Sequence, residues 1–147
     1  MEPDLVVEIP GKPRTQGSMT LWKDPRTGGE RAKYAPETVA HRNLVVGMAR
    51  QGWGARERLT GPVAVHVLAE FARPKSHYGT GRNAARLKPW APVLHDQAPD
   101  GDKVARLVLD ALTIAGVYVD DGQASVLRVE KRWSEGASRT VVEVYGL

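Results

Sequence analysis

The chain has 147 residues, no cysteine and a formal net charge of +4 at pH 7. This length suits one domain with its own core, and the lack of cysteine excludes disulfide frameworks, thiolate zinc sites and thiol catalysis. No apolar run approaches the roughly 18 residues of a membrane helix. The acidic residues 1–4 precede nothing that resembles a signal peptide. We therefore expect a cytoplasmic protein with no membrane partner.

Basic residues are concentrated in two segments that contain no acid, residues 9–23 and 73–95. Acids gather later in the chain, from Asp96 to Asp121. Basic segments around an acidic cluster are typical of proteins that bind nucleic acid, although either run alone is equally compatible with a solvated surface. The residues that we predict to contact DNA are Lys12, Arg14, Arg73, Lys75, Arg82, Arg86, Lys88 and Lys131.

In the first half of the chain, the pattern predicts a strand, a helix and a second strand. Residues 5–9 form the first strand, and the Gly- and Pro-rich residues 11–35 predict a long basic loop or an irregular hairpin. Pro36 starts a helix that runs to about Gln51, with Gly52 as its stop. Its predicted apolar stripe is Ala40, Leu44, Val45 and Met48. Residues 63–71 alternate as a half-buried strand, with Val63, Val65, Val67, Ala69 and Phe71 on one face.

The second half begins with a long basic loop over residues 74–99. A helix follows over residues 102–115, with Asp102 as N-cap and Gly116 after its end. Its predicted buried face is Val104, Leu107, Val108, Ala111, Leu112 and Ala115. Residues 117–119 predict a short strand, and residues 124–133 and 139–145 predict an antiparallel hairpin. The order β-α-β-α-β-β-β indicates a single α/β (α+β) domain over residues 1–147, with a mixed sheet and two main helices.

Four aspartates are the candidate metal ligands. Asp100 and Asp102 stand two apart at a loop-to-helix junction, and side chains at this spacing in an extended segment point the same way. Asp120 and Asp121 end a strand one helix later, and a helix folded back onto the sheet would bring them beside Asp100. Oxygen ligands of this kind suit Mg²⁺ or Mn²⁺ rather than zinc. Taken alone, each aspartate pair is more often an N-cap or a turn.

Two cations near this helix start suit phosphodiester chemistry. Lys103 and Arg106 lie in or near its first turn, where positive charge would stabilise a developing phosphate charge. Arg106 and Asp110 are also helix neighbours four residues apart, and the alternative interpretation of that pair is an ordinary surface ion pair.

Three segments and a later lysine resemble the RusA-type Holliday junction resolvases. They are Pro99-Asp100-Gly101-Asp102-Lys103, Asp110-Ala111-Leu112 with Ala115-Gly116, Asp120-Asp121-Gly122-Gln123, and Lys131 in the next strand. The resemblance implies a homodimeric, Mg²⁺- or Mn²⁺-dependent endonuclease of DNA recombination and repair that resolves four-way junctions by paired symmetric nicks. Such enzymes are common in phages.

The resemblance also assigns roles to individual residues. It places the metal ligands at Asp100, Asp102 and Asp121, with Asp120 in support. The family's catalytic lysine falls on Arg106, so an ammonium would have to come from Lys103. Gly101 is a second departure, because an apolar residue often fills that position.

Other functions and other sites are alternatives to a RusA-type resolvase with this aspartate site. A restriction-type nuclease does not fit, because Val129 stands where its motif needs an acid two residues before Lys131. A non-cleaving module that binds branched or single-stranded DNA remains the main alternative, and a small-molecule phosphohydrolase would not need the basic loops. Weaker candidates are His66 with Glu70, His95 with Asp96 as metal contacts, and Tyr78 and Trp90, which either stack on unpaired bases or anchor their loop. We expect Trp133 and Tyr145 in the core.

Overall fold

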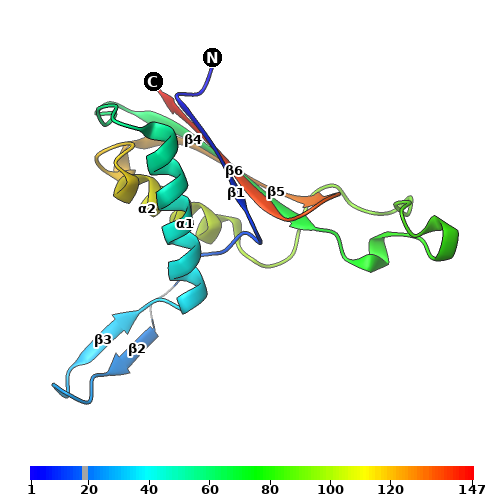
Figure 1. Ribbon diagram of the computed structural model, residues 1–147, viewed down its shortest axis with the longest axis horizontal. Helices are drawn as coiled ribbons and strands as arrows, with labels where there is room; N and C mark the ends of the chain where they lie inside the picture. Colours follow the sequence, from blue (N-terminus) through cyan, green and yellow to red (C-terminus); the bar gives the residue numbers. More distant parts are fainter. Residues whose placement is uncertain (18–19) are drawn as a thin grey trace.

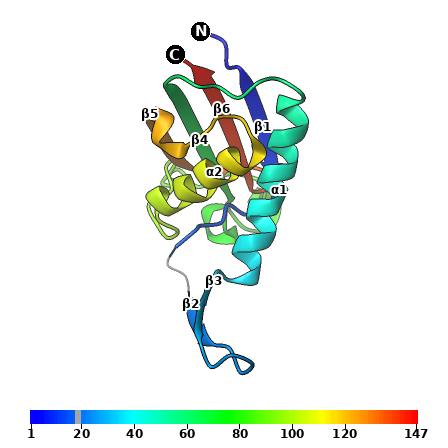
Figure 2. The same cartoon turned by 90° about the vertical axis from the view of Figure 1, so that its left-hand side faces the viewer.

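A four-stranded mixed sheet carries both long helices on one of its faces (Figure 1, Figure 2). The computed structural model describes residues 1–17 and 20–147. The elements are β1 (Leu5–Pro10), β2 (Thr20–Lys23), β3 (Glu30–Lys33), α1 (Pro36–Trp53), β4 (Val63–Ala72), η1 (Lys75–His77), η2 (Gly81–Asn83), α2 (Gly101–Ala115), η3 (Asp121–Gln123), β5 (Ala124–Ser134) and β6 (Arg139–Gly146). This confirms the α+β class, the mixed sheet, the two main helices and their order. None of the described helices is both long and apolar enough to cross a membrane.

The strand order is β1-β6-β4-β5, so the expected hairpin of β5 and β6 is wrong. β4 lies between them, parallel to β5 and antiparallel to β6. The short connection after β5 passes the end of β4, where the Ser138 hydroxyl accepts the backbone N–H of Ala72 at 2.8 Å. β4 takes the central position because its inward residues, from Val63 to Phe71, are at most 4% exposed. β5 is left at the edge of the sheet.

Helix α1 packs on the sheet through part of the expected stripe, because Val45 is buried and Met48 packs against the core. Its buried residues are Val45, Val46, Ala49 and Trp53, whereas Ala40 and Leu44 are exposed. Gly52 does not stop the helix, which ends at Gly54 with φ +69°. A Cβ atom at Gly52 would lie only 2.9 Å from Leu5 Cδ1, so this glycine allows α1 to approach β1 closely.

Helix α2 forms as the sequence predicts along its length. All six expected core positions are buried, and Ala105 joins them. Gly116 ends the helix in the left-handed conformation with φ +83°, as its place after the last turn predicts. The expected short strand over residues 117–119 is reduced to a single bridge between Tyr118 and Leu59. Tyr118 is fully buried, and its hydroxyl donates to the Leu109 carbonyl at 2.8 Å.

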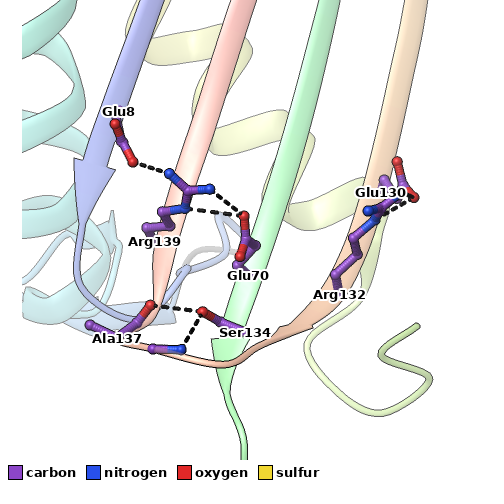
Figure 3. Close-up of polar contacts among 8 residues, drawn as sticks. Glu8, Glu70, Glu130, Arg132, Ser134, Ala137 and Arg139 are labelled. Atoms are coloured by element: carbon purple, nitrogen blue, oxygen red, sulfur yellow. Dashed lines mark hydrogen bonds and ion pairs between the residues drawn. The ribbon is translucent and has the colours of Figure 1, made fainter. Parts of the chain in front are cut away.

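The face of the sheet opposite the helices carries a mixture of acids and bases (Figure 3). Arg139 on β6 donates to Glu70 on β4 at 2.8 Å and also contacts Glu8 on β1. On β5, Arg132 pairs with Glu130 at 2.6 Å. Because opposite charges neutralise each other here, this face lacks the continuous positive charge that a DNA backbone attracts.

Two segments project from the body of the protein at different ends (Figure 1). One is the β2–β3 hairpin, so of the two structures predicted for residues 11–35, a loop or a hairpin, the hairpin is the one that forms. The other, which we call the basic arm, comprises residues 73–92 and contains two short 3-10 turns and one isolated bridge between Tyr78 and Leu87. At the base of the basic arm, Arg73 Nη1 donates to the Pro92 carbonyl at 2.6 Å.

Candidate active site and nucleic-acid interface

Two exposed carboxylates mark the start of α2. Asp100 is the N-cap residue, with extended φ −68° and ψ 135°, and Asp102 lies in the first turn. The expected cap at Asp102 is therefore wrong by two residues, and the Asp100 side chain makes no capping hydrogen bond. Lys103 Nζ lies 3.3 Å from Asp100 Oδ2. The positive end of the helix favours both negative charges, so this position suits a pair of ionised carboxylates.

Strand β5 contacts the chain just before the start of α2. Lys131 Nζ donates to the carbonyl oxygens of Gln97 at 2.6 Å and Pro99 at 2.8 Å. Asp102 and Lys131 line the same open pocket of about 530 Å³, together with apolar side chains of β5. Lys131 was expected to contact DNA, and that contact stays a prediction. The structure shows its ammonium bonded to the backbone just before Asp100.

The second acidic pair lies on the one-turn helix η3. Asp120 caps it by accepting the backbone N–H of Gly122 at 3.3 Å. The Asp120 carboxyl, in hydrogen-bonding contact with Asp121, raises the pKa of Asp121 above its ordinary value, and burial and the charges of Asp120 and Asp110 add to this effect. Two carboxylates held so close together form a site where a cation would relieve their repulsion.

The two acidic pairs lie apart within one chain. A Cβ atom at Gly101 would lie 3.6 Å from Val129, so the helix start faces the middle of β5, whereas Asp121 precedes the first residue of that strand. The five residue steps from Ala124 to Val129 span about 16 Å. Among the described residues, no group of three or more His, Asp or Glu side chains is placed to hold a metal ion. The expected approach of Asp121 to Asp100 does not occur within one chain, because the return after Gly116 reaches only part-way along α2.

Asp110 belongs to a contact between the two helices. Its Oδ2 lies 3.2 Å from Arg42 Nη1 on α1, and Arg42 is mostly buried. The ion pair weighed between Asp110 and Arg106 is thus replaced by one that joins α1 to α2. Arg106 itself is exposed on α2, one turn after Asp102.

The family model described as Endodeoxyribonuclease RusA matches residues 10–145. The chain belongs to the RusA endodeoxyribonuclease family. None of the curated proteins matches it. Membership implies Holliday junction resolvase activity in general, on branched DNA and with a divalent metal. In this RusA chain, the two acidic pairs that resemble the resolvase motif occupy two separate places, the start of α2 and η3 with its cap.

Apart from Lys131 on β5, the basic residues assigned to DNA binding in this RusA chain lie outside the four-stranded sheet. Lys12, Arg14, Lys75, Arg82 and Arg86 are exposed, the first two after β1 and the others on the basic arm. Arg73 and Lys88 are partly buried. Arg73 closes the base of the arm, and Lys88 Nζ stands 5.6 Å from the centre of the Trp90 ring. The exposed cations thus lie away from the mixed-charge sheet face, on surfaces open to a large partner.

His77 in the basic arm and His95 just after it pack into an aromatic cluster. His95 is 6% exposed, stacks on Phe71 with ring centres 4.1 Å apart, and contacts Trp133. Burial, followed by the charge of Lys131, lowers the pKa of His95 from its ordinary value. His77 packs edge-on against Trp133, which is partly buried against the core as expected. This aromatic cluster accounts for the burial of both histidines.

The side chains of His66 and Glu70 lie on the mixed-charge sheet face. His66 is 3.9 Å from Glu143 and packs near the Tyr145 ring, while Glu70 pairs with Arg139. Tyr145, expected in the core, lies on this face too, and its hydroxyl donates to Glu143 at 2.6 Å. All of these contacts are accounted for by ordinary surface pairing.

Gln123 is a site residue that motif matching leaves without a role. Its side-chain oxygen accepts the backbone N–H groups of Val119 and Asp120 at 2.8 and 2.9 Å. Its amide nitrogen donates to the carbonyls of Leu59 and Gly61. The sequence held a signal for this, because Asp followed three residues later by Gln is a capping-box pattern. Gln123 thus fixes the turn that presents both aspartates of η3.

Proposed function

We propose that this RusA chain is a Mg²⁺- or Mn²⁺-dependent, structure-selective endonuclease that resolves four-way DNA junctions by paired symmetric nicks. We further propose that residues 1–147 act as one endonuclease domain, in the cytoplasm. The observation that carries the proposal is the exposed pair Asp100 and Asp102 at the helix start, with Lys103 beside it, in a chain matched by the family over residues 10–145.

The donor chemistry fits a divalent cation of this kind. Mg²⁺ prefers oxygen ligands, keeps several of its waters and is commonly held by one or two carboxylates together with substrate phosphate. Asp100, Asp102 and Asp121 would hold the ion, with Asp120 supporting Asp121. When bound, such a cation polarises a phosphodiester oxygen and lowers the pKa of water.

The remaining chemistry falls to the cations around the helix start. Lys103 and Arg106 would neutralise the charge that develops on the phosphate during cleavage. The Arg106 guanidinium acts by charge alone, whereas the Lys103 ammonium is also a potential proton donor. Both lie on α2 with Asp102, so one rigid element would position the carboxylates and the cations together.

The separation of the two acidic pairs supports a homodimer. In an isologous dimer, a contact between two different patches occurs twice, related by the twofold axis. Asp121 of one copy could then join Asp100 and Asp102 of the other, and two equivalent sites would result. Two sites related by a twofold axis are what paired symmetric nicks require.

The junction arms would be held by the exposed cations after β1 and on the basic arm. Phosphate contacts of this type position DNA without reading its sequence. Trp90 is 61% exposed among these cations, whereas Tyr78 is partly buried, so we assign base stacking to Trp90.

Cleavage of a labelled four-way junction, beside a linear duplex of the same sequence, tests the proposed activity. The wild type should make paired nicks only in the junction and only with Mg²⁺ or Mn²⁺. Asp102→Asn should abolish cleavage and retain metal-free binding, while Glu57→Gln, at an exposed acid between α1 and β4, should cut normally. Cleavage by Asp102→Asn at the wild-type rate would refute the site.

A non-cleaving module that binds branched DNA is the second candidate. It is favoured by the distance between the acidic pairs within one chain and by Arg106 in place of the family's lysine. Tight junction binding by the wild type, with no cleavage in either metal, would establish this alternative instead.

A further inference from the structure

Asp100 lies between two attachments of the chain to strand β5. On its N-terminal side, the Lys131 ammonium donates to the carbonyls of Gln97 and Pro99 at 2.6 and 2.8 Å. On its C-terminal side, Gly101 packs over Val129, and a Cβ there would lie 3.6 Å from Val129 Cγ1. Val129 and Lys131 are two residues apart on the same face of β5. The direction of the Asp100 side chain therefore depends on one strand.

The contacts of Lys131 direct its charge into the protein. The two carbonyl oxygens come from residues two apart, and they converge on a single partly buried ammonium. Without that cation, the two carbonyl oxygens would have no hydrogen-bond donor between them. Residues 97–99 would then shift so that water could hydrogen-bond to these oxygens. The backbone before this segment is bonded to β5, where the His95 N–H donates to the Lys131 carbonyl at 3.0 Å. Residues 97–99 have no helix or strand hydrogen bonds of their own, so the ammonium is what extends that attachment toward Asp100.

We infer that Lys131 is a positioning residue for the resolvase site: its ammonium fixes residues 97–99, and through them the presentation of Asp100 and Asp102. This inference rests on the proposed function only for its effect on cleavage. The clamp, meaning the two hydrogen bonds from the Lys131 ammonium to the carbonyls of Gln97 and Pro99, is a property of the free protein without metal or DNA. A phosphate contact is the rival role for Lys131, and the two roles differ in what the loss of its charge changes.

The test compares Lys131→Met with Lys131→Arg and Arg128→Met. Methionine keeps most of the length of the side chain and removes its donors, whereas arginine retains donors for both carbonyls. Arg128 lies on the same strand with a side chain 69% exposed, so its replacement removes equal charge without touching the clamp.

In the free protein, hydrogen exchange of the amides in residues 97–104 should accelerate in Lys131→Met and not in Arg128→Met. In cleavage, Lys131→Met should lose about 10–100-fold in activity or in apparent Mg²⁺ affinity, as is usual when a group behind a metal ligand is removed. Lys131→Arg should recover most of that loss. Metal-free junction binding should keep its dependence on salt, whereas loss of a phosphate contact would lower that slope by about one.

Three results would each overturn the inference. The first is unchanged amide hydrogen exchange in Lys131→Met, and the second is an equal loss of cleavage in both Lys131 variants. The third is a reduced salt dependence of junction binding together with normal Mg²⁺ dependence of cleavage. If the wild type does not cleave, the proposed function fails, and the exchange experiment still decides whether Lys131 is a clamp. If Lys131→Met does not fold, Lys131→Arg must retain wild-type exchange and Mg²⁺ dependence, and a deficit in either would contradict the role.

Discussion

Gln123 offers a direct test of how the second acidic pair is held. Its four hydrogen bonds join the backbone at Val119 and Asp120 to the backbone at Leu59 and Gly61. Replacement with alanine removes all four bonds at once. Because three of them are exposed and water replaces them in part, each contributes near the lower end of the usual range, about 0.5 kcal/mol.

The sum predicts that Gln123→Ala lowers the free energy of unfolding by about 2 kcal/mol. For a chain of this size, such a loss corresponds to a fall in Tm of about 4–8 °C. Urea unfolding followed by circular dichroism measures the free energy, and junction cleavage measures the effect on the site. Cleavage should fall at temperatures where the variant is still folded, since the turn that carries Asp120 and Asp121 loosens before the domain unfolds.

Two matched variants make the result interpretable. Gln51→Ala removes an exposed glutamine from α1 and should change the unfolding free energy by less than about 0.5 kcal/mol. Gln123→Glu keeps both acceptor bonds but places a carboxylate oxygen against the Leu59 and Gly61 carbonyls, so it should destabilise the protein at least as much as Gln123→Ala. A loss in Gln123→Ala no larger than in Gln51→Ala would refute the reasoning, because the four bonds would then contribute nothing beyond what water supplies.

Three further predictions follow from local geometry. Gly52→Ala should stabilise the protein less than Gly47→Ala, because the end of the Leu5 side chain must move aside for the new methyl group at position 52, whereas position 47 has open space; equal urea midpoints would contradict this. Trp90→Ala should weaken junction binding by about 1–3 kcal/mol and linear duplex binding by less, measured by fluorescence anisotropy; equal losses would argue against stacking on an unpaired base. Burial lowers the pKa of His95, so the unfolded chain takes up a proton that the folded protein resists. Stability should therefore be fully present above pH 6.5, the ordinary value, and decline as pH falls below it. Urea unfolding at pH 7.5 and 5.5 checks this, and His95→Phe should show a smaller decline than the wild type.

Much of the fold follows from local sequence pattern. Alternation in β1 and β4, the apolar face of α2 and the glycine after its last turn are local properties, and each occurs where the sequence predicts it. The resolvase motif is local too, since short spacings place Asp100 with Asp102 and Asp120 with Asp121. Even the anchoring role of Gln123 was present as a capping-box pattern.

Other features depended on contacts between residues far apart in the chain. Alternation in β5 and β6 indicates which face of each strand is buried and not which strand is its neighbour. The sequence pattern therefore did not reveal that β4 lies between them. In α1, apolar residues occur on two overlapping stripes, and the contact with the sheet buries Val46 and Ala49 while Ala40 and Leu44 stay exposed.

The candidate site likewise has features that the local sequence predicts and features that only the tertiary structure sets. Sequence spacing brings each pair of aspartates together, because neighbours in the chain cannot lie far apart. The distance between the pairs is set by how far α2 extends along β5, and the position of Lys131 is set by the register of that strand beneath residues 97–99. Strand order and register are collective properties of the whole sheet, since a strand is placed by all the neighbours that its side chains and hydrogen bonds must satisfy together.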